Sequence, residues 1–323
     1  MFVDDATILV TGGTGSFGQK FAEIVLQEHR PKTVRIYSRD ELKQVQMQER
    51  FKDPRLRFLI GDVRDRQRLY RALNGVDLVV HAAALKQVPV AEYNPLEAIK
   101  TNIEGAANLI DASIDNGVPR VMALSSDKAV HPVNLYGATK LVAEKLIIQA
   151  NAYRGRANTR FSVVRYGNVV GSRGSVIPVF RAQAKTGILS LTDERMTRFW
   201  ITQEQAVRFI LNSIDWMQGG EVFVPKIPSM RVVDLARAVA PDSKLNVVGI
   251  RPGEKLNEIL VTEEEAPRTR DFDDHFVIEP EHPFWKQEQP KPGKPLPAGF
   301  RYTSDGNNQW LTSEQLREML RDL

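Results

Sequence analysis

A glycine-rich turn near the start of the chain restricts the possible folds more than any other feature. Residues 11–18 read TGGTGSFG, after the short apolar run Ala6–Thr11 and before Gln19–His29, which has helical periodicity. Glycines at such a junction let the backbone turn sharply and approach a pyrophosphate, and the following helix then offers its first N–H groups. A tight turn without a ligand would also use glycines, but the order of strand, turn and helix favours dinucleotide binding. The residues predicted to contact the cofactor here are Gly12, Thr14, Gly15, Ser16, Phe17 and Gly18.

Short apolar segments alternate with helical stretches through the first half of the chain. This alternation predicts βαβ units around a buried parallel sheet, which is an α/β fold of the doubly wound Rossmann type. The predicted strands after the first are residues 33–37, 57–60, 77–81, 120–124 and 160–164.

The regular alternation weakens after about Tyr166. The proline-rich segment Pro280–Pro297 predicts an extended surface stretch, and Thr312–Leu323 predicts a capped helix with Ser313 near its start. We expect a dinucleotide-binding domain over residues 1–170 that returns near 197–225. A smaller, discontinuous substrate-binding lobe is expected from residues 171–196 and 226–323.

Composition removes several classes of function. The 323 residues include no cysteine, which excludes disulfides, thiolate metal sites and cysteine nucleophiles. The 44 basic and 40 acidic residues are mixed along the chain without a dense basic run, so nucleic-acid binding is not expected. Neither a signal peptide nor an apolar run of ~18 residues is recognisable, which fits a cytoplasmic protein without membrane contact. No metal site is predicted, because the five histidines lack ligand-like spacing: His29, His81, His131, His275 and His282.

The end of the second predicted strand indicates which dinucleotide is bound. Ser38 lies 20 residues after the last glycine of the turn, where the adenosine ribose is expected. A hydroxyl and a guanidinium, from Ser38 and Arg39, suit a 2′-phosphate, and Lys43 could add charge unless it is simply solvated. Asp40 favours NAD instead, but the balance of charge predicts NADP.

Two later strand ends carry residues that a cofactor could approach. Asp62 and Val63 follow one strand, and Ala82, Ala83 and Ala84 follow the next. Small side chains let the backbone come close to a ligand, although tight packing would also use them.

A tyrosine and a lysine form the predicted centre of the chemistry. Tyr136 and Lys140 are spaced i, i+4, so a helix places them on one face. A protonated lysine lowers the pKa of a nearby phenol, and Tyr136 could then accept a hydroxyl proton while hydride leaves the same carbon. Lys140 could also bond the nicotinamide ribose. The Y-x-x-x-K pattern alone is common by chance, but here it follows the glycine-rich turn and a strand end that carries Ser126.

Taken together, the glycine-rich turn, Asp62-Val63, Ser126, and Tyr136 with Lys140 resemble the extended short-chain dehydrogenase/reductase family over nearly the whole chain. This resemblance implies a nicotinamide cofactor and a nucleotide-sugar substrate.

The triplet Ser126-Asp127-Lys128 narrows the resemblance. It is similar to the inverting UDP-N-acetylglucosamine 4,6-dehydratases that open pseudaminic acid synthesis, whereas ordinary sugar 4,6-dehydratases carry Thr-Asp-Glu and epimerases lack the acid and base pair. Ser126 and Gln87 depart from the usual threonine and histidine. Further matching blocks are residues 37–44, 81–95, 165–178, 196–202 and 250–255.

The resemblance implies a reaction in which hydride leaves sugar C4 for NADP⁺, water is lost across C5 and C6, and hydride returns to C6. Tyr136 and Ser126 would bind the C4 hydroxyl. Lys128 is expected to be the C5 base, which requires a pKa lowered by burial or by Lys86 and Lys140, and Asp127 the acid, with a raised pKa. A salt bridge between Asp127 and Lys128 is the alternative, but adjacent side chains on an extended strand point to opposite faces.

The resemblance also implies a set of binding residues. Asn168 is expected to contact the diphosphate, and Arg173, Gly174 and Ser175 form a polar turn suited to an anion. Arg198 suits substrate contact or a structural salt bridge equally well. The implied substrate-binding residues are Lys86, Thr101, Asn102, Ser126, Asn168, Arg173, Thr197, Arg198, Arg251 and Glu254, and Lys86 and Val169 are also expected beside the cofactor.

Two other functions stay open. A UDP-sugar 4-epimerase would use Tyr136 and Lys140 but needs neither Asp127 nor Lys128. A non-catalytic, NADP-sensing regulator would use the same fold, since a fold alone does not prove activity. In every case we expect a homo-oligomer, a dimer or a hexamer.

Overall fold

A computed structural model describes residues 1–171, 176–281 and 292–320. Its main element is a ten-stranded sheet with the order β16-β14-β15-β10-β6-β5-β4-β1-β2-β3. Seven neighbouring strands are parallel, and six of them have the order 3-2-1-4-5-6 of a doubly wound dinucleotide-binding sheet, so the predicted fold is confirmed. The parallel strands are β1 (Thr7–Thr11), β2 (Thr33–Ser38), β3 (Leu56–Ile60), β4 (Leu78–His81), β5 (Arg120–Ser126), β6 (Arg160–Tyr166) and β10 (Val222–Pro225).

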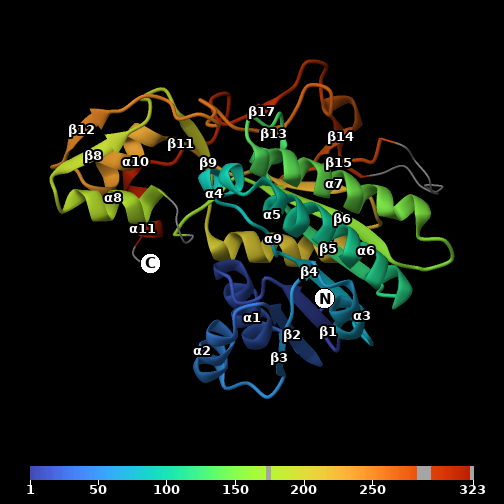
Figure 1. The fold of residues 1–323 in the computed structure, drawn as a ribbon. Helices are drawn as coiled ribbons and strands as arrows, with labels where there is room; N and C mark the ends of the chain where they lie inside the picture. The colour runs from blue at the N-terminus through green and yellow to red at the C-terminus, as the bar shows by residue number, and fades with distance from the viewer. Residues whose placement is uncertain (172–175, 282–291, 321–323) are drawn as a thin grey trace.

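Helices cover the sheet in two layers (Figure 1). In one layer α3, α6 and α7 pack against one another, and in the other α1 packs against α9. Several of these helices begin at a polar cap: the Asp40 side chain accepts from the Lys43 amide at the start of α2, and Thr202 and Gln205 form a capping box on α9. The helices of this part are α1 (Ser16–Glu28), α2 (Glu41–Phe51), α3 (Arg66–Ala72), α4 (Val88–Tyr93), α5 (Pro95–Ile99), α6 (Gly105–Asp115), α7 (Leu135–Tyr153) and α9 (Gln203–Trp216), with a π-helical turn at Lys100–Glu104.

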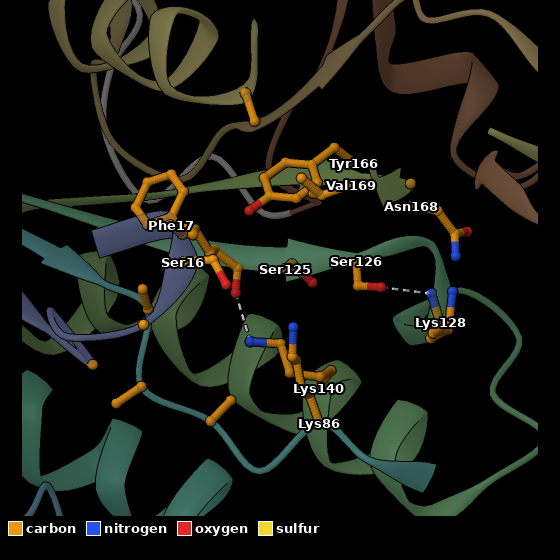
Figure 2. Close-up of a pocket in the computed structure, with 18 of the residues that line it drawn as sticks. Ser16, Phe17, Lys86, Ser125, Ser126, Lys128, Lys140, Tyr166, Asn168 and Val169 are labelled. Carbon is orange, nitrogen blue, oxygen red and sulfur yellow. Dashed lines mark hydrogen bonds between the residues drawn. The ribbon is translucent and has the colours of Figure 1, made fainter. Parts of the chain in front are cut away.

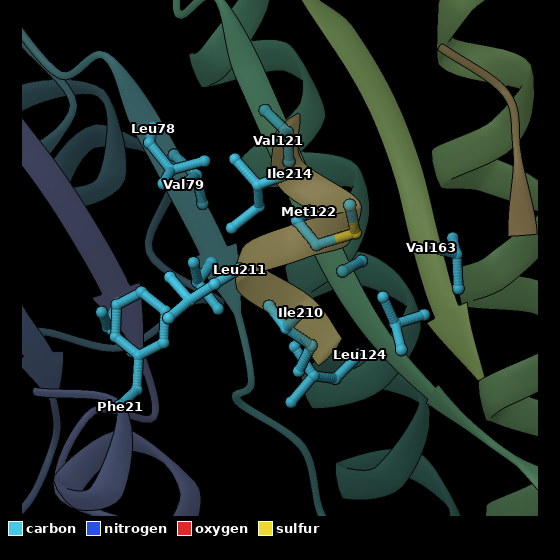
Figure 3. Close-up of a cluster of buried hydrophobic side chains, with 14 of the residues drawn as sticks. Phe21, Leu78, Val79, Val121, Met122, Leu124, Val163, Ile210, Leu211 and Ile214 are labelled. Atoms are coloured by element: carbon cyan, nitrogen blue, oxygen red, sulfur yellow. The ribbon is translucent and has the colours of Figure 1, made fainter. Parts of the chain in front are cut away.

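The core forms where helix faces meet the central strands. Ile210 and Leu211 of α9 are buried against Met122 of β5 and Phe21 of α1 (Figure 3). Strands β1 and β4 are buried along their whole length, which explains why they appear in the sequence as continuous apolar runs.

A smaller lobe has a core of its own around Trp200 and Leu235. Its last helix begins at Ser313, as predicted, and is capped by Thr312 and Gln315. Residues 321–323 of the predicted helix lie outside the described ranges. The elements of this lobe are β7 (Asn168–Val169), α8 (Val176–Ala184), β8 (Ile188–Leu191), β9 (Thr197–Ile201), β11 (Ser229–Arg231), α10 (Val232–Val239), β12 (Lys244–Val247) and α11 (Ser313–Met319). β13 (Ile259–Val261) and β17 (Tyr302–Thr303) form a separate antiparallel two-stranded sheet.

The end of the chain does not belong wholly to that lobe. Strands β14 (Thr269–Asp271), β15 (His275–Ile278) and β16 (Lys294–Pro295) return to the main sheet, where β15 pairs antiparallel with β10. Residues 269–278 and 294–295, which the predicted boundaries give to the second lobe, thus extend the main sheet. These strands are only two to four residues long, and β14 leads into β15 with three residues between them, so the βα pattern does not reveal them. Among the described residues, no helix is both long and apolar enough to cross a membrane.

Candidate active site

Two adjoining cavities open where the carboxyl ends of the parallel strands meet, as expected for an open α/β sheet. They share Gly12, Ala83 and Ala84. The first has a volume of about 430 Å³ and is lined by Gly12, Gly15, Ser16, Phe17, Ala82–Ala84, Lys86, Leu124, Ser125, Ser126, Lys128, Tyr136, Lys140, Tyr166, Gly167, Asn168, Val169, Gln203 and Ala206. The second, of about 460 Å³, is lined by Gly12, Thr14, Tyr37, Ser38, Arg39, Asp40, Lys43, Gly61, Asp62, Val63, Ala83, Ala84 and Thr101.

The glycine-rich turn has the geometry that a dinucleotide requires. Gly12 adopts a φ of 65°, and a Cβ there would lie 2.9 Å from the Cα of Ala83, so only glycine fits. No side chain caps the start of α1 at Gly15, which leaves its first amides available to an anion. Gly18 lines neither cavity: a Cβ there would lie 2.3 Å from the Gly13 carbonyl oxygen. Gly18 thus allows close packing of α1 on the turn, and its contact with the cofactor stays a prediction.

A buried hydrogen-bond network that we did not predict positions the backbone of Ala82 and Ala83. Thr11 Oγ1 accepts from the amides of Ala82 and Ala83, both at 3.2 Å, and lies 2.7 Å from Nδ1 of His81. Burial lowers the pKa of His81 to about 3, and Lys140 contributes in the same direction. His81 is therefore neutral, and its Nδ1 can accept the Thr11 hydroxyl proton.

The outer cavity collects the residues predicted at the adenosine ribose. The Asp40 carboxylate both caps α2 and pairs with the ammonium of Lys43, so its charge is already compensated. Arg39 is 53% exposed and lies 3.5 Å from Asp62. The Ser38 hydroxyl accepts from Gln44 at 3.2 Å, which leaves its proton available. The Arg39 guanidinium and the Ser38 hydroxyl thus line this cavity beside an Asp40 carboxylate that is paired with Lys43.

Tyr136 and Lys140 both face the inner cavity from the first turns of α7. Lys140 Nζ donates to the Leu124 carbonyl, and burial lowers the pKa of Lys140 to about 8 even though Glu144 opposes the change (Figure 2). The pKa of Tyr136 is raised: burial outweighs the opposing effects of Lys128 and of a hydrogen bond shared with Ser126. The predicted lowering of the tyrosine pKa by Lys140 is therefore wrong for this structure.

The triplet Ser126-Asp127-Lys128 does not lie on an extended strand. β5 ends at Ser126, and Asp127–Ala129 form a 3₁₀ turn, so neighbouring side chains no longer alternate between faces. Lys128 Nζ donates to Asp127 Oδ1 at 3.0 Å, and the Ser126 hydroxyl donates to the same oxygen at 2.7 Å. The argument from strand alternation against this salt bridge is wrong.

The charge of Lys128 also differs from the expected one. Burial favours the neutral amine, but the carboxylates of Asp127 and Glu258 prevail and raise the pKa of Lys128 well above its usual range. Glu258 Oε1 lies 3.5 Å from Lys128 Nζ. Asp127 is fully buried, and its Oδ2 has no hydrogen-bond partner among the described residues. In this structure Lys128 is an ammonium held by two carboxylates.

The residues implied for the substrate separate into two groups. Lys86 and Asn168 line the inner cavity, and Asn168 lies at the same end of it as Lys128 (Figure 2). Asn168 Oδ1 is buried without a hydrogen-bond partner in the described structure, which leaves it ready for a ligand. Thr101 lines the outer cavity instead. Asn102 lines neither cavity. Its Oδ1 accepts from the Leu85 amide at 2.8 Å, and its Nδ2 donates to the Leu85 carbonyl at 2.9 Å.

Four of the remaining predicted contacts line neither cavity: Thr197, Arg198, Arg251 and Glu254. Arg198 donates to the carbonyl oxygens of Thr197, Lys255 and Leu256, so the structural role applies. The Thr197 hydroxyl bonds Ser304 at 2.6 Å, within the protein. Arg251 and Glu254 line neither cavity, and Arg173, Gly174 and Ser175 lie outside the described residues.

The sequence alone missed several residues of this site. Ser125, Tyr166, Gln203 and Ala206 line the inner cavity, and Glu258 pairs with Lys128. One signal for Glu258 was present: it is a single carboxylate directly before the apolar run of β13. A charge at that position calls for a buried partner.

Residues 8–280 match the polysaccharide biosynthesis protein family. Over 322 residues the chain is 49% identical to a UDP-N-acetylglucosamine 4,6-dehydratase (inverting) of Campylobacter jejuni serotype O:2, covering 97% of this chain and 96% of that protein. It is also 44% identical to a UDP-glucose 4-epimerase of Rickettsia conorii, covering 86% of this chain and 84% of that protein.

Two solved structures extend these similarities to three dimensions. The structure of Pen from Bacillus thuringiensis superposes with a TM-score of 0.90 at 39% identity and full coverage of both chains. DesIV of Streptomyces venezuelae, a dTDP-glucose 4,6-dehydratase with NAD bound, has a TM-score of 0.69 at 25% identity, covering 77% of this chain and 86% of that one.

Proposed function

The chain belongs to the polysaccharide biosynthesis protein family, and we propose that it is a C5-inverting UDP-N-acetylglucosamine 4,6-dehydratase. The observation that carries this proposal is the Asp127–Lys128 ion pair beside Tyr136 in a dinucleotide cavity, in a chain that resembles such a dehydratase over nearly its full length. Its product would be UDP-2-acetamido-2,6-dideoxy-4-keto-hexose, the first intermediate of a pseudaminic acid-type synthesis. We propose that this activity is cytoplasmic, which the absence of cysteine fits. We also propose that the protein is a homo-oligomer.

The proposed cofactor is a nicotinamide dinucleotide, and the geometry of Gly12 and of the uncapped α1 start suits its pyrophosphate. When bound, it supplies the chemistry of taking hydride from sugar C4 and returning it to C6. Tyr136 takes the proton of the C4 hydroxyl as the ketone forms, and Ser126 holds the same oxygen. Lys140, which faces the same cavity, bonds the ribose.

The Asp127–Lys128 pair performs the elimination. The new ketone acidifies C5–H, so a base can remove that proton while the C6–O bond breaks and the departing hydroxide takes a proton to become water. A proton from solvent is then added to C5 on the face opposite Lys128, and Lys128 gives up the C5 proton to solvent. The sugar loses one water in total.

The resting charges supply the acid and the base together. Lys128 holds the proton, and the 3.0 Å hydrogen bond to Asp127 is a direct route for its transfer. Asp127 Oδ2 is buried and has no hydrogen-bond partner among the described residues. The transfer yields a neutral amine to take the C5 proton and a carboxylic acid to protonate the leaving hydroxyl.

Incubating the protein with UDP-N-acetylglucosamine in D₂O tests the proposal. We expect a 4-keto-6-deoxy product that carries deuterium at an inverted C5, observed by NMR. Retained C5 geometry would overturn the assignment to Lys128. A product of unchanged mass would establish the epimerase, because epimerisation loses no water, and dinucleotide binding without any turnover would establish the sensor.

The outer cavity leads us to propose NADP over NAD. Replacing Arg39 with alanine should weaken NADP⁺ binding about tenfold or more and change NAD⁺ binding little, because only NADP⁺ has a 2′-phosphate to pair with the guanidinium. Calorimetric titration of both cofactors measures this. Arg64→Ala is the matched control, since Arg64 also pairs with Asp62 but does not line the cavity. Equal losses for both cofactors in Arg39→Ala would contradict the preference.

A further inference from the structure

Glu258 is a buried carboxylate that takes no part in the bond-making steps proposed above. It is 3% exposed and immediately precedes β13. Its backbone is fixed on both sides by Ser304, whose hydroxyl accepts from the Glu258 amide and whose amide donates to the Glu258 carbonyl, each at 2.9 Å. The side chain is thereby directed to a fixed place.

Three cations surround this carboxylate. Oε1 lies 3.5 Å from Lys128 Nζ and 3.7 Å from Arg198 Nε, and Oε2 lies 3.6 Å from Lys255 Nζ. Oε2 has no hydrogen-bond partner among the described residues. A buried charge is costly unless it is paired, and these three ion pairs provide the pairing for the carboxylate.

The segment before Glu258 is hydrogen-bonded at two points to residues 130–134, which connect the Asp127–Ala129 turn to α7. Lys255 Nζ donates to the Val130 carbonyl, and Asn134 Nδ2 donates to the Gly253 carbonyl at 2.8 Å. Asn134 also caps α7, the helix that presents Tyr136. Glu258 therefore belongs to a segment whose backbone is held next to Lys128 by these hydrogen bonds and by Ser304.

We propose that Glu258 is a positioning residue for Lys128, holding its Nζ between two carboxylates so that it can exchange a proton with Asp127 and with sugar C5. The role given to C5 rests on the proposed dehydratase function, but the hold on Lys128 does not. Asp127 alone would leave the lysine stem free to rotate, because Lys128 is 25% exposed on the cavity side.

The charges around Lys128 determine the sign of the expected change. Asp127 and Glu258 favour the ammonium, and Arg198 opposes it. Tyr136 and Lys255 also lie within electrostatic range. Removing the Glu258 charge takes away one of the two groups that stabilise the ammonium, so Lys128 should lose its proton at a lower pH.

Glu258→Gln tests the proposal, with Glu265→Gln as the matched control, because Glu265 is a largely buried carboxylate that pairs with Arg165 and not with Lys128. Trace labelling with acetic anhydride across a pH series, analysed by peptide mass spectrometry, gives the titration midpoint of each lysine without turnover. We expect the Lys128 midpoint to fall by about one pH unit or more in Glu258→Gln. It should stay at the wild-type value in Glu265→Gln, and surface Lys20 should not change in either variant.

Turnover and thermal unfolding complete the test. We expect kcat for water loss to fall about tenfold or more in Glu258→Gln while KM changes less than about threefold, because the lysine and not the substrate is displaced. An unchanged Lys128 midpoint, or a loss of thermal stability alone, would overturn the proposal. The labelling result stands whether or not wild-type protein dehydrates UDP-N-acetylglucosamine, so failure of the proposed function can be told apart from failure of this inference.

Discussion

Replacing Tyr136 with phenylalanine is expected to lower turnover of UDP-N-acetylglucosamine by about 10²- to 10⁴-fold, the range that general acid–base groups contribute. The C4 hydroxyl must lose its proton as hydride departs, and Tyr136 is the phenol beside Ser126 in the inner cavity. Because every later step needs the 4-ketone, no reduced nicotinamide should form and no deuterium should enter C5. Rapid-mixing absorbance and NMR in D₂O measure these two effects.

Tyr166→Phe is the matched control for that variant. Tyr166 is a second buried tyrosine of the same cavity, and burial raises its pKa as well. Since it has no assigned proton transfer, its loss should change kcat less than about tenfold, below the general acid–base range. Equal losses in both variants would show that Tyr136 acts by filling space, and would contradict its role in proton transfer.

Replacing Lys128 with arginine is expected to block a different step. Arginine keeps the positive charge between Asp127 and Glu258 but does not release its proton, so the ion pairs can persist while proton exchange stops. Water loss should fall about 10²-fold or more, whereas C4 oxidation continues. Reduced nicotinamide should therefore accumulate, which distinguishes this variant from Tyr136→Phe.

Lys128→Met provides the comparison for charge. It leaves two buried carboxylates without their ammonium, so its thermal unfolding should move to a lower temperature than that of Lys128→Arg. Near-normal water loss in Lys128→Arg would mean that the residue contributes only its charge, and the elimination would then need another proton carrier.

The sequence predicts the parallel half of the fold well, and the reason is local. β1, β4 and β6 are largely buried apolar runs that alternate with helices, so the pattern along the sequence reveals them. The strands β14 to β16 have no such context, because their place beside β10 depends on contacts between distant parts of the chain. Burial patterns along the sequence carry no information about which sheet edge a short strand will join.

The same distinction applies to the site. Tyr136 and Lys140 are four residues apart on one helix, so spacing alone places both at the cavity. The charge of Lys128 depends on Glu258, which is remote in sequence, and the turn that brings Lys128 to Asp127 is only three residues long. The predicted pKa was therefore wrong in direction although the residue itself lines the cavity.

The late return of β15 to the main sheet has a consequence for how the protein is made. While a nascent chain is shorter than 275 residues, the outer side of β10 has no pairing partner, although the glycine-rich turn and the catalytic helix have already emerged from the ribosome. An open strand edge recruits other chains. Pairing of β15 with β10, together with the pairing of β14 and β16 beyond it, is thus the step that separates a growing chain prone to association from the finished sheet.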